Sequence, residues 1–185
     1  MYKQQAKSGI MISFFHKIVD VLNTNHISYM LSGSVAMSVY ILPRATRDFD
    51  FVVQLSPGDI EVFVKGFEEG YYCDADAVKD AVLRHSIFNI IDYNSGYKAD
   101  FIVLKNEPFR IVEFNRKVQM DYFGRNIFLV TPEDLILSKL IWIQELRSAV
   151  QMEDIQNLSE IKALNWRYIN DWISELKLNT FNLFT

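Results

Sequence analysis

Residues 29–54 read YMLSGSVAMSVYILPRATRDFDFVVQ, and this stretch combines two strand patterns with a turn and a helix pattern. Its first apolar run ends in a Ser-Gly-Ser turn, after which the sequence predicts a short helix over 35–41. A proline ends that helix, and a second apolar run over 49–54 predicts a buried strand. Two aspartates stand at the head of this second run, so acidic side chains would lie where a strand begins.

The two acids, Asp48 and Asp50, alternate with Phe49 and Phe51. Residues i and i+2 of a strand point to the same face, so the two carboxylates would lie side by side and the two rings would be buried opposite them. Adjacent carboxylates repel each other, and a divalent cation with a preference for oxygen ligands, Mg²⁺ or Mn²⁺, would neutralise them. The alternative is a solvated strand end, at which two acids cost little.

The turn Ser32-Gly33-Ser34 would join the first strand to the helix. Glycine lets a backbone approach a ligand closely, and the free N–H groups at a helix start attract anions. The hydroxyl of Ser34 can cap the helix or donate to a phosphate. Alone, Ser-Gly-Ser indicates only a turn, so the interpretation depends on the acids that follow.

A third carboxylate, Asp100, stands at the head of another apolar run, over 101–104. If that run forms a strand beside the strand over 49–54, the three acids converge. The sequence therefore predicts a divalent-metal site that faces a phosphate-binding loop. A second Asp-x-Asp sequence, Asp74-Ala75-Asp76, serves as an internal control. It precedes a helix pattern and no strand, so capping explains its acids and we assign it no site.

Three basic residues are candidates for contact with phosphate. Lys139 lies inside an apolar helical run, where an unpaired lysine would be costly, although its ammonium group can also extend to solvent. Arg44 and Arg47 flank the acidic pair and can contact phosphate or form ion pairs with the acids. The ion pair is the simpler interpretation for both arginines.

Composition sets the class of protein. The chain has 185 residues, of which 50% are hydrophobic and 14% aromatic, which is enough for a well-packed core. A net charge of -4 argues against the strongly basic surface of many nucleic-acid-binding proteins. The single cysteine, Cys73, excludes an intramolecular disulfide, and we find no signal-peptide pattern and no membrane-spanning run. We therefore expect a cytoplasmic protein without membrane contact.

The predicted fold class is α/β (α+β), a mixed sheet flanked by helices, followed by a C-terminal helical segment. We place an α/β core in residues 1–130 and the helical segment, packed on this core, in 131–185, because strand patterns stop near residue 130. Hairpins are predicted over 88–93 with 98–104 and over 118–122 with 127–130. Helices are predicted from residue 8 to 22 and over 60–67, 74–84, 107–116, 131–147, 153–161 and 166–176.

The order of these motifs resembles the signature of the nucleotidyltransferase superfamily, which shares a DNA polymerase beta-like fold. The resemblance covers residues 29–104 and rests on Gly33-Ser34, the run Asp48-Phe49-Asp50-Phe51 and Asp100. The segment 131–135 with Lys139 is also similar to the one that follows the core in the AbiEii/AbiGii-type toxin branch. Arg147 and Asp154 fit that branch, whereas Glu153 replaces its basic residue.

The resemblance implies a role for each site residue. Asp48 and Asp50 would bind two Mg²⁺ (or Mn²⁺) ions, and Asp100 would bind one of them and assist deprotonation of an acceptor hydroxyl. A nucleoside triphosphate would be the substrate, and pyrophosphate would leave. The phosphates would be met by the loop and by basic side chains: Ser32, Gly33, Ser34, Arg47 and Lys139.

The acceptor stays open at this stage. A tRNA end, a protein hydroxyl and a small molecule are all compatible with the motifs. The resemblance to the toxin branch favours a tRNA or protein acceptor and implies a possible antitoxin partner. Two other functions are kept as alternatives: a nucleotide- or protein-binding module without turnover, and a metal-dependent phosphodiesterase. The sequence lacks paired His or Cys ligands for zinc, a P-loop, a dinucleotide-binding glycine motif and a Gly-x-Ser-x-Gly motif.

Overall fold

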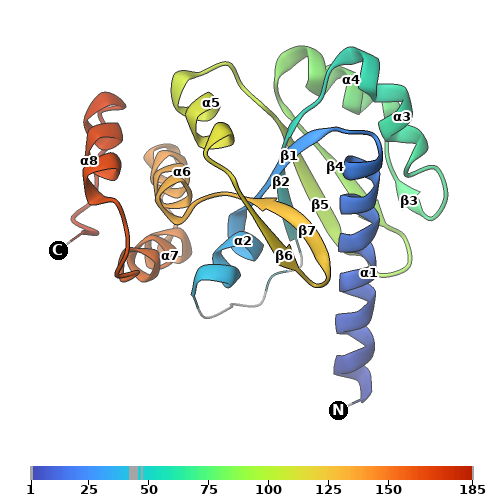
Figure 1. Ribbon diagram of the computed structural model, residues 1–185, viewed down its shortest axis with the longest axis horizontal. Helices are drawn as coiled ribbons and strands as arrows, with labels where there is room; N and C mark the ends of the chain where they lie inside the picture. The colour runs from blue at the N-terminus through green and yellow to red at the C-terminus, as the bar shows by residue number, and fades with distance from the viewer. Residues whose placement is uncertain (1, 42–45, 47, 185) are drawn as a thin grey trace.

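The apolar runs on either side of the Ser-Gly-Ser turn form two central strands of a seven-stranded mixed sheet (Figure 1). The computed structural model describes residues 2–41, 46 and 48–184, and it describes residues 2–8 by their backbone alone. The strand order is β3-β4-β5-β2-β1-β7-β6. The strands are β1 (Ser28–Ser32), β2 (Asp48–Gln54), β3 (Tyr71–Tyr72), β4 (Ile87–Asp92), β5 (Lys98–Val103), β6 (Val118–Tyr122) and β7 (Arg125–Leu129).

Helices cover both faces of this sheet. In Figure 1, α1, α3 and α4 lie to one side of the sheet, and α2 and α6 to the other, with α7 and α8 beyond α6. The mixture of parallel pairs (β1 with β7, β2 with β5) and antiparallel pairs confirms the predicted fold class. The helices are α1 (Tyr2–Thr24), α2 (Gly33–Tyr40), α3 (Ile60–Lys65), α4 (Ala75–Arg84), α5 (Pro108–Asn115), α6 (Pro132–Glu145), α7 (Ala149–Ser159) and α8 (Trp166–Glu175), with a short 3₁₀ helix at Pro57–Asp59.

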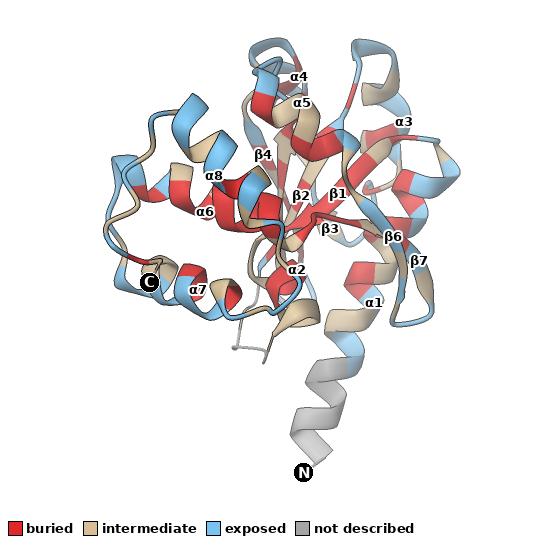
Figure 2. Cartoon of the chain, turned by 60° about the vertical axis from the view of Figure 1, so that its left-hand side comes forward, coloured by how far each residue is buried: buried red, intermediate tan, exposed pale blue. Residues whose placement is uncertain are grey.

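The core on the side of α1 and α3 is aromatic. Phe101 of β5 stacks on Phe51 of β2 at 5.5 Å and on Phe88 of β4 at 5.1 Å between ring centroids, and Phe63 of α3 packs edge-on against it. Phe49 and Phe51 are buried, as the strand alternation predicts. Figure 2 shows buried residues along the central strands β1 and β2. The opposite face of β2 therefore carries Asp48, Asp50 and Val52.

Most predicted elements are present, and the differences have local causes. The first helix begins at Tyr2 and not at residue 8. The helix α7 begins at Ala149, four residues before the predicted start, because the side chain of Ser148 accepts a hydrogen bond from the N–H of Gln151 and caps it. The two-residue strand β3 was not predicted, because only its pairing with β4 defines it. The helix predicted from residue 131 is present as α6, and Thr131 caps it, since its Oγ1 accepts from the N–H of Asp134.

Among the described residues, no helix is both long and apolar enough to cross a membrane. The C-terminal helices attach through polar contacts as well as apolar ones. The fully buried carboxylate of Asp134 on α6 accepts hydrogen bonds from Arg116 Nε at 2.9 Å, from the Tyr168 hydroxyl and from Thr131 Oγ1. Tyr168 lies on α8, so this cluster ties the last helix to α6. The division of the chain at residue 130 stays a prediction.

Candidate active site

A row of polar side chains crosses the centre of the sheet. In the parallel pair of β2 and β5, Asp50 lies opposite Asp100, and in the antiparallel pair of β1 and β2, Ser32 lies opposite Asp50. Partners in register point to the same face, and neighbouring strands lie about 4.8 Å apart. The predicted adjacency of the two strands is therefore present. It places Asp100 beside Asp50, whose carboxylate lies against the start of α2.

Gly33 fixes how α2 meets this row. Its φ is +65°, a left-handed conformation that favours glycine. A Cβ atom at this position would lie 1.8 Å from Oδ2 of Asp50 and 2.8 Å from the Cβ of Asp50. No other residue leaves this space, so glycine allows the Asp50 carboxylate to lie directly against the first turn of α2.

The electrostatic state of Asp50 is unusual for an aspartate. Its pKa is raised to about 6, chiefly by burial and then by the charges of Asp100 and Asp48, whereas Lys139 and Lys98 act in the opposite direction. Within the described part of the chain, its carboxylate has no hydrogen-bond or ion-pair partner. Ionising such a group costs free energy, and a bound cation would remove that cost.

Asp100 and Asp48 differ from Asp50. Lys98 Nζ forms an ion pair with Asp100 Oδ2 at 2.8 Å, and the hydrogen bond within this pair raises the pKa of Lys98. Asp48 lies opposite Lys98 in register, at the exposed end of β2. Among the residues that the structure describes, no three or more His, Cys, Asp or Glu side chains gather closely enough to hold a metal ion. Mg²⁺ is commonly bound by one or two carboxylates together with substrate phosphates, and the Asp50–Asp100 pair fits that donor set.

Lys139 is buried, with 6% of its surface exposed, so its ammonium group does not reach solvent. Its Nζ donates to Asp154 Oδ2 on α7 and to Gln151 Oε1, each at 2.8 Å. The ion pair with Asp154 offsets the cost of burying the lysine. Because Lys139 also lowers the pKa of Asp50, its charge acts on the acid row from the side of α6.

The other predicted residues are placed as follows. Ser34 is the second residue of α2 and partly buried, and Ser32 precedes the helix without a side-chain cap. Arg44 and Arg47 lie outside the described residues. The control pair behaves as predicted, since Asp74 caps α4 by accepting from the N–H groups of Asp76 and Ala77.

Sequence reasoning missed two neighbours of Asp100. Lys98 stands two residues before Asp100, the same i, i+2 spacing that identified the acids, and this spacing could have indicated its position on the same face. Asn89 of β4 lies opposite Asp100 in register and is partly buried. Its signal was a polar residue between Phe88 and Ile90, which alternation places on the face of the acids.

Comparison with known proteins gives matches to solved structures only. No protein-family model matches the chain, and no curated protein sequence matches it. The structure of ANT(2'')-Ia in complex with adenylyl-2''-tobramycin matches with a TM-score of 0.61 at 11% identity, over 90% of this chain and 96% of that one. A solution structure of the antibiotic-resistance factor ANT(2'')-Ia matches with a TM-score of 0.57 at 11% identity, over 91% of this chain and 92% of that one.

The lincosamide antibiotic adenylyltransferase LnuA, bound to lincomycin, matches with a TM-score of 0.56 at 16% identity, over 80% of this chain and 96% of that one. At these identities the likeness concerns the fold. The chain therefore has the nucleotidyltransferase-like fold of ANT(2'')-Ia and LnuA, a mixed sheet flanked by helices.

Proposed function

We propose that the protein is a Mg²⁺-dependent nucleotidyltransferase, which moves a nucleoside monophosphate from a nucleoside triphosphate to an acceptor hydroxyl. One observation carries the proposal: Asp50 and Asp100 lie in register on neighbouring strands, directly below the glycine that begins α2. The fold supports the same class of reaction, because LnuA is an adenylyltransferase.

The Asp50–Asp100 pair would hold the divalent ion, with Asp48 beside it at the open end of β2. The fit rests on the Asp50 carboxylate, which is partly buried and has no partner within the described chain. When bound, Mg²⁺ or Mn²⁺ would neutralise the charge of the carboxylates and of the nucleotide phosphates. The same donor set suits a phosphodiesterase, but the loop before the acids favours transfer.

The chain's own residues supply the remaining parts. The N–H groups at the start of α2, at Gly33 and Ser34, would face the phosphates of the nucleotide, together with Lys139 and, as the sequence predicts, Ser32 and Arg47. The acceptor oxygen would attack the α-phosphorus, the bond to the bridging oxygen of the β-phosphate would break, and pyrophosphate would leave. Asp100 would take the proton of the acceptor hydroxyl, with its carboxylate oriented by Lys98.

For the acceptor, we place a small hydroxyl compound first. The two matched proteins are seen with adenylyl-2''-tobramycin and with lincomycin, which are small molecules. A tRNA end and a protein hydroxyl come second, because among the described residues only Lys98 and Lys139 bring positive charge to the acid row. A toxin function with an antitoxin partner rests only on the resemblance of residues 131–154.

A label-transfer assay tests the proposal. Purified protein is incubated with Mg²⁺, one α-labelled nucleoside triphosphate at a time, and a cell extract that is afterwards separated into small-molecule, RNA and protein fractions. We expect label in the small-molecule fraction with the wild type and none with Asp50→Asn. Asp76→Asn is the matched control, because it alters the second Asp-x-Asp sequence, and it should transfer label normally. Nucleotide binding without transfer to any fraction would support the binding module instead.

A further inference from the structure

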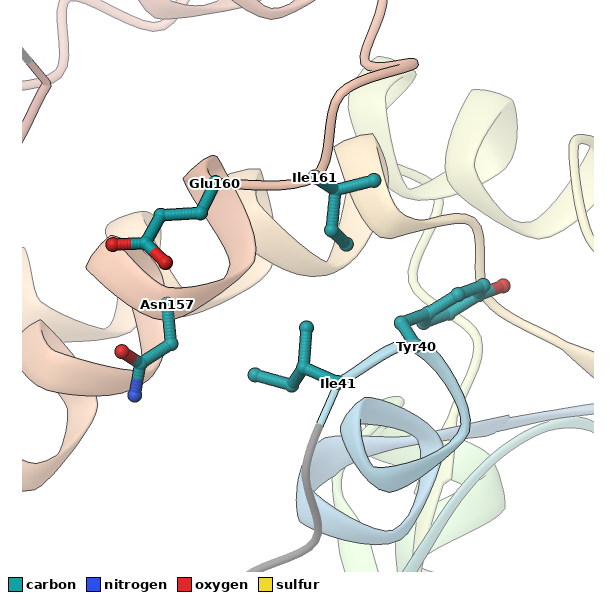
Figure 3. A pocket seen from close by; sticks show the side chains of 5 residues that line it. All are labelled: Tyr40, Ile41, Asn157, Glu160 and Ile161. Carbon is teal, nitrogen blue, oxygen red and sulfur yellow. The ribbon is translucent and has the colours of Figure 1, made fainter.

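The outer edge of β6 offers a partner more than the cavity of about 500 Å³ between the ends of α2 and α7 does (Figure 3). The polar side chains of that cavity, Asn157 and Glu160, are exposed, so water already satisfies them. An edge strand instead presents a row of backbone N–H and C=O groups at fixed spacing, and another strand can pair with the whole row.

The two edges of the sheet differ in length. The sheet ends in β3 on one side and in β6 on the other (Figure 1). The strand β3 has two residues, whereas β6 has five and pairs with β7 at each of them, without a bulge. Natural proteins usually keep an edge strand from pairing with another chain by a lysine, a proline or a bulge. The sequence of β6, VQMDY, contains neither lysine nor proline.

The turn between β6 and β7 determines which backbone groups point outward. Phe123 and Gly124 have φ values of +50° and +74°, the conformation of a two-residue hairpin turn. In such a hairpin the pair next to the turn is hydrogen-bonded, and so is every second pair after it. Gln119 and Asp121 therefore direct their N–H and C=O groups away from β7. Within the described chain, no backbone hydrogen bond outside the β6–β7 ladder involves these two residues.

The side chains around β6 leave this edge accessible. Val118 and Phe123 are apolar, yet they are 42% and 44% exposed. Lys117, directly before the strand, is turned back onto Phe114. Its Nζ donates to the carbonyl of Phe114 at 3.1 Å and lies 3.8 Å from the centroid of the ring. The ammonium group of Lys117 is thus bound within its own chain and does not protect the edge.

The strand is complementary to a second copy of itself. If two β6 strands pair antiparallel about a two-fold axis at Met120, all five residues overlap. Gln119 of one copy then lies opposite Asp121 of the other, so the outward N–H and C=O groups of both copies are matched. The Gln119 amide can donate to the Asp121 carboxylate, and Val118 meets Tyr122. A shift by two residues toward the turn would instead put the two Asp121 carboxylates opposite each other.

We infer that β6 is an interface between two copies of this chain, which pair their β6 strands antiparallel and form one continuous sheet. The inference does not depend on the proposed function. The strands β7 and β1 separate β6 from β2, which carries Asp50, so the pairing leaves the acid row open.

Sedimentation equilibrium of the full chain tests the interface. We expect the wild type to form dimers. Gln119→Pro should weaken the dimer about tenfold or more, because proline removes an outward N–H from each copy and leaves the bonds to β7 in place. Gln119→Ala is the matched control, because it changes the same side chain but keeps the N–H, and it should weaken the dimer less. A wild type that is monomeric at every concentration, or a proline variant that associates as strongly as the alanine variant, would overturn the inference.

A cysteine cross-link tests the register and needs no proline variant. In a Cys73→Ser background, Met120→Cys puts two cysteines at a non-hydrogen-bonded pair, with Cα atoms about 4.5 Å apart, within the range of a disulfide. We expect this variant to become a covalent dimer on oxidation. Val118→Cys is the matched control, because the two copies of this position would lie about 14 Å apart along the strands. Equal cross-linking of both variants, or none of Met120→Cys, would overturn the inference.

Discussion

Two carboxylates of this protein, the partly buried Asp50 and the fully buried Asp134, have opposite surroundings. Asp134 accepts hydrogen bonds from Arg116, Thr131 and Tyr168, and the guanidinium of Arg116 also lies 3.9 Å from the centroid of the Tyr168 ring. Asp50 has no such partner in the described chain, and burial and neighbouring acids raise its pKa to about 6. A carboxylate whose bonding capacity is filled by the protein stabilises the fold. A carboxylate whose capacity is unfilled costs stability and is available to a ligand.

The largest effect on stability is expected for a substitution of Asp134. Asp134→Ala removes the shorter of the two ion pairs of Arg116, the hydrogen bond from Thr131 and the bond that holds α8, so we expect a loss of about 3–5 kcal/mol in the free energy of unfolding. Urea denaturation followed by circular dichroism measures it. Asp171→Ala, at an exposed position within α8, is the control and should lie within about 0.5 kcal/mol of the wild type. A loss of less than 1 kcal/mol for Asp134→Ala would contradict the structural role.

Gly33→Ala should displace Asp50 by a steric clash. The added methyl group meets the carboxylate, so either Asp50 or the start of α2 must move, and we expect transfer to fall about 100-fold. The left-handed φ adds a stability cost of about 1–2 kcal/mol. Gly70→Ala is the matched control, because it has a φ of +83° with no atom near the added Cβ. Transfer rates that fall equally in both variants would show that strain alone, and not the position of Asp50, is responsible.

Asp50→Asn should stabilise the metal-free protein while it abolishes transfer. The folded pKa, about 6, is raised above the ordinary value of 3.8, so the stability that the neutral acid provides is present below pH 3.8 and is lost as pH rises through 6. That loss corresponds to about 3 kcal/mol at most. We therefore expect the variant to unfold at higher urea concentrations than the wild type at pH 8 in EDTA, and the difference to vanish near pH 4. A destabilised variant at pH 8 would mean that Asp50 has a partner in solution.

The smallest effect is the response to Mg²⁺. The ion should raise the melting temperature of the wild type at pH 8, by about 2–4 °C for each kcal/mol of binding free energy, and should not raise that of Asp50→Asn. At pH 5, below the raised pKa, Asp50 is protonated, so the shift in the wild type should shrink. Differential scanning calorimetry with and without Mg²⁺ measures both. Equal shifts in the two proteins would exclude Asp50 as a metal ligand.

The same two carboxylates show what sequence reasoning could reach. The sequence placed Asp50 correctly on the face of its strand opposite Phe49 and Phe51. Alternation is a local rule, and the burial of the two rings fixes it. For Asp134 the sequence predicts only a place in the first turn of the helix over 131–147. Its other partners, Arg116 and Tyr168, are far away in the sequence, and no periodicity predicts such contacts.

At the candidate site, too, the sequence predicts the relations between neighbouring residues but not the contacts between distant ones. The i, i+2 rule predicted that Asp48 and Asp50 share a face, but the register of β2 against β5, which puts Asp100 beside Asp50, is a property of the assembled sheet. The apolar surroundings of Lys139 indicated a buried cation in need of a partner. That Asp154 supplies this partner follows only from the packing of α7 against α6.

The pairing of β2 with β5 also has a consequence for how the protein forms. Parallel pairing between strands so far apart in the chain closes a long loop, and contacts of this kind form slowly and late. During synthesis, Asp50 has left the ribosome well before Asp100, and Lys139 has left it before Asp154. A nascent chain thus carries both acids of the DFDF run before it has the strand that would complete the proposed site for a metal ion. We expect the capacity to bind one to appear abruptly, with the last contacts of the fold, so that ion binding reports a finished molecule.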